Sequence, residues 1–113
     1  NMRTILLAKD HNNFTHSGLY LIHDEDNGYI NMMGDDPDLR QSGASIKLIW
    51  EAIKICKTKT LKKIDFQGSE LERLEKIRRY FGATQTKYYS LKKANNILTK
   101  IFIFLRSIQR SYF

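Results

Sequence analysis

The sequence predicts an α+β protein with some α/β character, built on a mixed sheet in the order β-β-β-α-β-α-β plus a C-terminal helix. Three observations predict it. Residues 4–33 contain three short apolar runs separated by polar turns, which is typical of an antiparallel meander. Residues 42–57 are apolar around most of a helical circumference, so this helix is expected to pack on the sheet. The apolar run at 61–66 should then pair in parallel with the third strand, because the helix crosses over between them.

The first half of the chain is expected to be mostly strand. An Asn27-Gly28 pair between the second and third runs is typical of a tight hairpin. The spacing of apolar residues predicts three strands, at residues 4–8, 18–23 and 29–33.

The second half alternates between strand and helix. Ser69 followed by Glu72 has the spacing of a capping box, and Gly82 suits the C-terminal end of the same helix. The expected elements are a strand at 61–66, a helix at 70–81, a strand at 84–91 and a helix at 97–110. We expect residues 1–93 to form one domain and residues 94–113 to form a separate amphipathic helix.

Charge is distributed unevenly along the 113 residues, whose net charge is +7. Residues 1–38 carry seven acids against two bases, whereas the rest carries seventeen bases against five acids. Such asymmetry indicates an anionic partner, for which a phosphorylated cofactor, RNA and a membrane surface are the alternatives, although dispersed lysines also occur as a solvated face. The single cysteine, Cys56, is expected to be a buried thiol in a reducing compartment. No signal peptide or membrane-spanning run is evident, so we expect a cytoplasmic protein.

The stretch from Arg40 to Ser45 has the pattern strand, small-residue turn, helix. At a helix N-terminus, free backbone N–H groups can hold a phosphate. Gly43 lets the backbone approach an anion closely, and Arg40 adds a positive charge. The alternative is that Ser42 simply caps the helix and Gly43 eases the turn. Spacing alone leaves both interpretations open.

Asp65 ends the predicted parallel strand and is expected to lie beside the Arg40 loop. It could orient an amine or accept a proton, or instead bond to backbone N–H groups of its own turn. The three histidines are spread over loop and strand without metal-ligand spacing, so no metal is expected.

Several stretches together resemble the GNAT acyltransferase superfamily, and within it the FemAB-like branch of bacterial, peptidoglycan-linked aminoacyltransferases. The resemblance covers about residues 4–93. It is carried by residues 29–34, Arg40-Gln41-Ser42-Gly43-Ala44-Ser45, residues 48–53, 64–69 and 80–83, and Tyr88-Tyr89.

The resemblance implies that the Arg40 loop holds the pyrophosphate of acyl-CoA, such as acetyl-CoA. Arg40 and Gly43 match the pattern Arg/Gln-x-x-Gly-x-Gly/Ala, while Ser45 replaces its last residue. The FemAB-like branch would instead take its acyl group from aminoacyl-tRNA. The implied donor-binding residues are Met33, Arg40, Gln41, Ser42, Gly43, Ala44 and Ser45, and the candidate catalytic side chains are Asp65, Ser69 and Tyr89.

Two departures from the family pattern favour a rival, non-catalytic module. Arg78 stands where many acetyltransferases place a tyrosine acid, and only the C-terminal half of the fold is expected, without its first strand and first two helices. Such a module would bind a partner or form a homodimer through its sheet edge or last helix. The helix at 97–110 would pack on its own sheet, on a partner helix or on an anionic membrane. RNA binding through the basic half is a further alternative.

Overall fold

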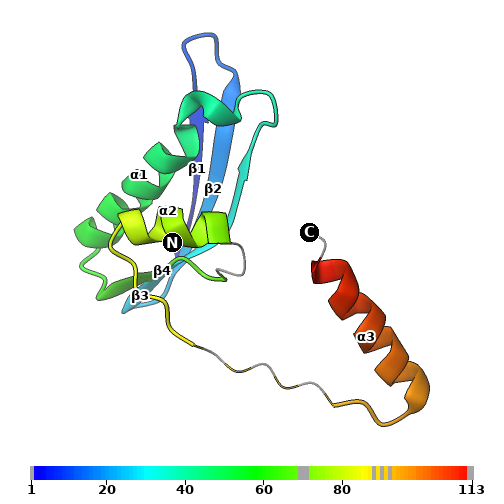
Figure 1. Cartoon of the computed structure of the whole chain (residues 1–113). Helices are drawn as coiled ribbons and strands as arrows, with labels where there is room; N and C mark the ends of the chain where they lie inside the picture. Colours follow the sequence, from blue (N-terminus) through cyan, green and yellow to red (C-terminus); the bar gives the residue numbers. More distant parts are fainter. Residues whose placement is uncertain (1, 69–71, 88, 90, 92, 112–113) are drawn as a thin grey trace.

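The computed structural model describes residues 2–68, 72–87, 89, 91 and 93–111. Figure 1 shows the elements in chain order. They are β1 (Arg3–Lys9), β2 (Thr15–His23), β3 (Asn27–Asp35), the 3-10 turn η1 (Arg40–Ser42), α1 (Ala44–Thr58), β4 (Lys63–Asp65), α2 (Glu72–Tyr80) and α3 (Ile97–Ser111). The predicted α+β class is confirmed.

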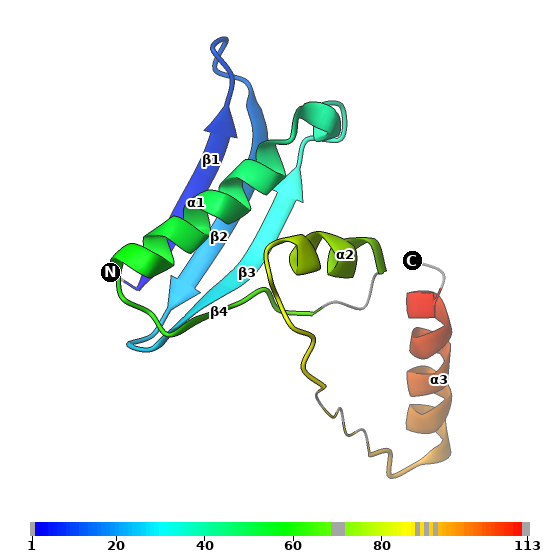
Figure 2. The ribbon, with the colours of Figure 1, turned by 60° about the vertical axis from the view of Figure 1, so that its left-hand side comes forward.

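The strands form one sheet in the order β1-β2-β3-β4. β1, β2 and β3 are antiparallel neighbours, and β4 pairs in parallel with β3. α1 connects β3 to β4 and runs across one face of the sheet (Figure 2). The predicted meander and the parallel pairing after the crossover helix are therefore both confirmed.

The predicted fifth strand at 84–91 is wrong for the part of it that the structure describes. Residues 84–87, 89 and 91 carry no strand. Tyr89 and Leu91 are 96% and 97% exposed, so neither side chain packs against the core. β4 contributes only three paired residues, which gives a further strand little edge to join. The boundary that we expect between residues 93 and 94 stays a prediction.

The core lies between α1 and the sheet. Leu19 and Leu21 alternate along β2 and face α1, which is the pattern of a strand with one buried side. Leu48, Ile49 and Ala52 form the buried side of α1. The buried cluster consists of Leu19, Leu21, Ile30, Leu48, Ile49, Ala52 and Cys56. Because non-polar burial is the main stabilising contribution to folding, this layer holds α1 against the sheet.

The turn between β2 and β3 differs from the predicted Asn-Gly hairpin. Asn27 and Gly28 belong to β3, and neither has a positive φ. The turn is fastened instead by Asp24, whose Oδ1 accepts hydrogen bonds from the N–H groups of Asp26 (2.8 Å) and Asn27 (2.6 Å). Gly28 is needed for packing, because a Cβ at this position would lie 2.5 Å from the Cys56 Sγ. Cys56 is buried as predicted, and burial raises the pKa of its thiol.

α3 stands apart from the sheet in both ribbon views (Figures 1 and 2). Its first turn is capped by Asn96, whose Oδ1 accepts a hydrogen bond from the Thr99 N–H at 2.8 Å. Among the described residues, no helix has both the length and the apolar character that are needed to cross a membrane.

The contact between Gly28 and Cys56 predicts coupled mutations. Gly28→Ala should lower the free energy of unfolding by about 1–3 kcal/mol, because the added methyl group overpacks the α1–sheet layer. The same change in a Cys56→Ala background should cost much less, since the clashing sulfur is gone. Gly34→Ala is the matched control, because a Cβ there meets nothing within 4 Å. Urea unfolding of the four variants measures the coupling, and additive effects would contradict it.

Candidate functional site

The turn between β3 and α1 has the geometry of an anion-binding corner. η1 ends at Ser42, and Gly43 follows in the left-handed conformation with φ +76°. α1 starts at Ala44, and the Lys47 N–H donates to the Gly43 carbonyl. The N–H groups of residues 44–46 therefore precede the first bond of the helical ladder, as expected at a helix N-terminus. The predicted helix start at residue 42 is two residues early, because the chain makes this 3-10 turn first.

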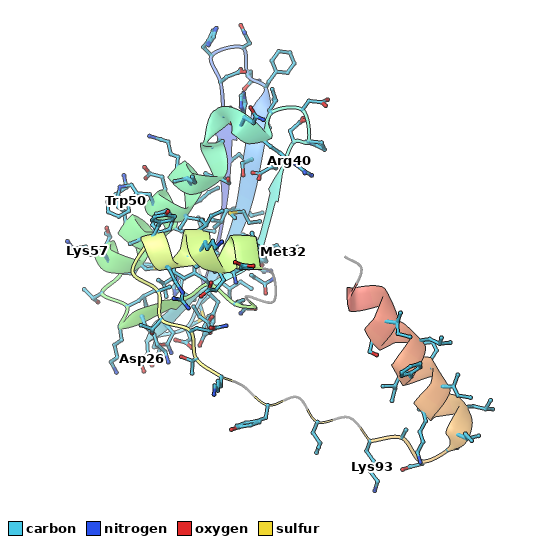
Figure 3. The ribbon with its side chains drawn as sticks, in the orientation of Figure 1. Asp26, Met32, Arg40, Trp50, Lys57 and Lys93 are labelled. Carbon is cyan, nitrogen blue, oxygen red and sulfur yellow. The ribbon has the colours of Figure 1, made fainter. Side chains whose placement is uncertain are left out.

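Little of the chain itself fills this corner. Gly43 is exposed, and a Cβ built on it would meet nothing within 4 Å. The Ser42 Oγ accepts only a long 3.4 Å hydrogen bond from the Ala44 N–H. A Ser42 cap would therefore satisfy just this one backbone N–H at the start of α1, and only weakly. Figure 3 shows Arg40 on the outside of the turn. Its guanidinium makes no hydrogen bond or ion pair with any residue that the structure describes.

β3 leaves part of its outer edge unpaired as it approaches the corner. β4 pairs only with Asn27, Gly28 and Tyr29, and then the chain turns away. The rest of β3 has no neighbouring strand on that side among the described residues. Met32 and Met33 on this stretch are 60% and 40% exposed. The result is an open strand edge that leads into the Gly43 turn.

A bulge in β3 lies within this open stretch. Leu21 pairs with Ile30 and Tyr20 with Met32, so Asn31 is an extra residue. Because paired residues share a face, Ile30 and Met33 lie on the α1 side and Met32 on the opposite side. The sequence interpretation missed this bulge. The feature of the sequence that could have indicated the bulge is the adjacent pair Met32 and Met33, which interrupts the alternation of apolar and polar residues.

Asp65 does not lie beside the Arg40 loop, so that prediction is wrong. β4 pairs Asp65 with Tyr29, which is about 20 Å along the strand from Asp35 at 3.3 Å per residue. The Asp65 Oδ1 accepts a hydrogen bond from the Gln67 N–H at 2.6 Å, as in the simpler of the two interpretations. The sequence pattern did not predict this separation, because it depends on the register between two distant strands.

Arg78 fastens α2 to the turn after β4. Its Nη1 donates to the carbonyl of Gln67 at 2.7 Å and also to that of Gly68. Burial lowers the pKa of the Arg78 guanidinium, and the charge of Asp65 opposes that shift. Phe66, just after β4, packs with Phe81, just after α2, with their ring centroids 6.3 Å apart. Sequence reasoning noted Arg78 only as a departure from a family pattern, but the structure gives it a positioning role.

Of the other two candidate catalytic side chains, only Tyr89 lies among the described residues. Ser69 lies outside the described residues, so its proposed cap with Glu72 is untested. Tyr89 lies beyond α2 on the exposed segment that precedes α3. Among the described residues, no group of three His, Cys, Asp or Glu side chains is suited to hold a metal ion.

This architecture occurs in solved acetyltransferase structures. A protein of Pyrococcus furiosus assigned as an acetyltransferase superposes with a TM-score of 0.73 at 15% identity, over 81% of this chain and 66% of its own. A Trypanosoma brucei acetyltransferase gives 0.70 at 15%, over 82% and 70%. The fold is that of the GNAT acetyltransferases.

A further matching structure was solved with a bound ligand. AAC(6')-Iy, solved in complex with a bisubstrate analogue that contains CoA, gives a TM-score of 0.70 at 12% identity. The superposition covers 85% of this chain and 71% of that one. This chain thus spans about two thirds of the length of these structures. No protein-family model matches the sequence, and no curated protein matches it significantly.

The Arg78 contacts predict a local effect of mutation. Arg78→Met should lower the free energy of opening of α2 by about 1–3 kcal/mol, because two hydrogen bonds from a charged donor are lost, and amide hydrogen exchange in α2 should become correspondingly faster. Arg79→Met is the control, since among the described residues the Arg79 side chain pairs with Glu75 on the same helix. Equal exchange in the two variants would mean that Arg78 does not hold α2.

Proposed function

We propose that this chain binds the acyl donor of an N-acyltransferase, and that the donor is an acyl-CoA such as acetyl-CoA. The observation that carries the proposal is the open edge of β3, which leads directly into the Gly43 turn. An edge and a turn in this order suit a ligand with an anionic head and a long, amide-containing arm. Acyl-CoA has both parts. The acetyltransferase fold supports the same donor.

The donor would bind in two parts. Its diphosphate would accept hydrogen bonds from the first N–H groups of α1, with Arg40 adding charge. The binding residues we propose at this end are Arg40, Gln41, Ser42, Gly43, Ala44 and Ser45. The amides of the pantetheine arm would pair with the β3 edge as a further strand does. The thioester would then lie near Met33 and the bulge at Asn31.

Transfer would proceed by direct attack of an amine on the thioester carbon. The C–N bond forms, the C–S bond breaks, and the proton that the amine loses passes to the departing thiolate, directly or through water. A backbone N–H near Met33 would stabilise the negative carbonyl oxygen, and positioning would supply much of the remaining rate. Because a thiol has a pKa of about 8–9, its thiolate leaves without a strong acid, so an arginine at position 78 is compatible with this chemistry. Asp65, Ser69 and Tyr89 are the proposed acceptor-side residues.

Two finer alternatives concern the donor and the activity. A FemAB-like enzyme would take its acyl group from aminoacyl-tRNA. A non-catalytic module, acting through protein–protein contacts or as a homodimer, is favoured by one observation. Tyr89 is almost fully exposed on a segment beyond α2, so it is not held close to the described carboxylate of Asp65.

Gly43 offers a sharp test of acyl-CoA binding. Gly43→Asn should abolish acetyl-CoA binding in isothermal titration calorimetry, because the side chain enters the space proposed for the diphosphate. Asparagine tolerates a positive φ, so the fold should be retained. Gly82→Asn is the matched control, because Gly82 also has a positive φ (80°) with open space around it. This control should bind acetyl-CoA as the unmodified chain does.

The same titration separates the alternatives. Binding of charged tRNA in place of acetyl-CoA would favour the FemAB-like donor. Binding of neither donor by the unmodified chain would contradict the transferase proposal and favour the module. Equal acetyl-CoA binding by Gly43→Asn and Gly82→Asn would contradict the diphosphate position.

A further inference from the structure

α3 presents a broad apolar surface that no other described element covers. Seven of its apolar side chains are 40–75% exposed, namely Ile97, Leu98, Ile101, Phe102, Phe104, Leu105 and Ile108. At about 100° per residue, these positions fall within an arc of about 160° around the helix. We call this surface the apolar arc. Ile103 is the one apolar residue of α3 that falls outside it.

Cations border the apolar arc on both sides. By the same helical spacing, Lys100 falls just beyond one border and Arg106 just beyond the other. The sequence carries no acid after Glu75. A helix with a wide apolar side, phenylalanines and flanking cations suits the boundary between lipid headgroups and acyl chains. Long basic side chains at its borders can reach phosphates while their stems stay in apolar surroundings.

The open face of the sheet, opposite α1, is the competing partner for the apolar arc. It too is apolar, since Ile5, Leu7 and Met32 are 70%, 55% and 60% exposed. Its charged positions on β1 are Arg3 and Lys9, which alternate with Ile5 and Leu7 on the exposed side. Docking α3 along β1, from the same chain or a second copy, would bring its cations towards Arg3 and Lys9, whereas the acids of residues 1–38 lie mostly in the connections at the ends of the strands. Charge complementarity therefore favours an anionic lipid surface.

We propose that α3 lies along the surface of an anionic membrane, with its apolar arc at the acyl boundary and Lys100 and Arg106 at lipid phosphates. The α1–sheet layer would remain in water, tethered by the segment between α2 and α3. Figure 3 shows Lys93 on this segment, which adds a cation close to the start of α3. This proposal does not depend on the donor site.

Sedimentation of the full chain with lipid vesicles tests the proposal. The chain should pellet with phosphatidylcholine vesicles that contain phosphatidylglycerol, and far less with phosphatidylcholine alone. Added salt should release it, because the attraction to the surface is partly electrostatic. Ile101→Asp should weaken binding about tenfold, because a carboxylate replaces an apolar side chain at the centre of the apolar arc.

Thr99→Asp is the matched control. It introduces the same charge two residues away on the polar side, and an acid in the first turn of a helix does not destabilise it. It should weaken vesicle binding only by the electrostatic repulsion of the added carboxylate, which both variants share.

A second variant, Lys100→Gln with Arg106→Gln, should retain weak binding but lose most of the salt dependence. Equal binding by Ile101→Asp and Thr99→Asp, or no binding of the unmodified chain to phosphatidylglycerol vesicles, would overturn the proposal. If a dimer forms that Ile101→Asp splits, and vesicles are not bound, α3 covers the open face of a second copy instead.

Discussion

The packing of α1 across β1, β2 and β3 is the constraint on which the rest of the structure depends. It brings Cys56 so close to Gly28 that no side chain fits between helix and strand at that point. At the other end of the helix, the same packing holds the first turn of α1 just beyond the end of β3. The candidate donor site is therefore a result of core packing, since its backbone groups are held in place by side chains that face away from it.

Local patterns in the sequence were sufficient to predict the elements that this packing uses. The apolar periodicity of residues 42–57 predicted α1, and the need for a crossover predicted that β4 runs parallel to β3. Gly43 was identified as the residue that shapes the turn, and it does take the left-handed conformation. The helix and the turn depend on neighbours within a few residues, and the direction of β4 follows from the crossover connection, so a single sequence contains the information needed to predict them.

Features that depend on the exact register between distant segments were not predicted. The bulge at Asn31 and the position of Asp65 both follow from strand register, which a turn or a packed helix can shift by one residue. The strand expected at 84–91 had suitable residues but lacked a long partner edge. Asn27-Gly28 looked like a hairpin signal, yet the glycine serves helix–sheet packing and Asp24 makes the turn. The positioning role of Arg78 was hidden for the same reason, because its acceptors belong to another segment.

The open edge of β3 has a consequence for how the protein behaves when it is empty. Unpaired N–H and C=O groups along an exposed strand can be joined by the strand of any other polypeptide, and such edges promote aggregation. A ligand that occupies this edge would shield it. Concentrated preparations without ligand are thus the conditions under which this chain is most prone to self-assemble, so its solubility should be judged with the edge both free and filled.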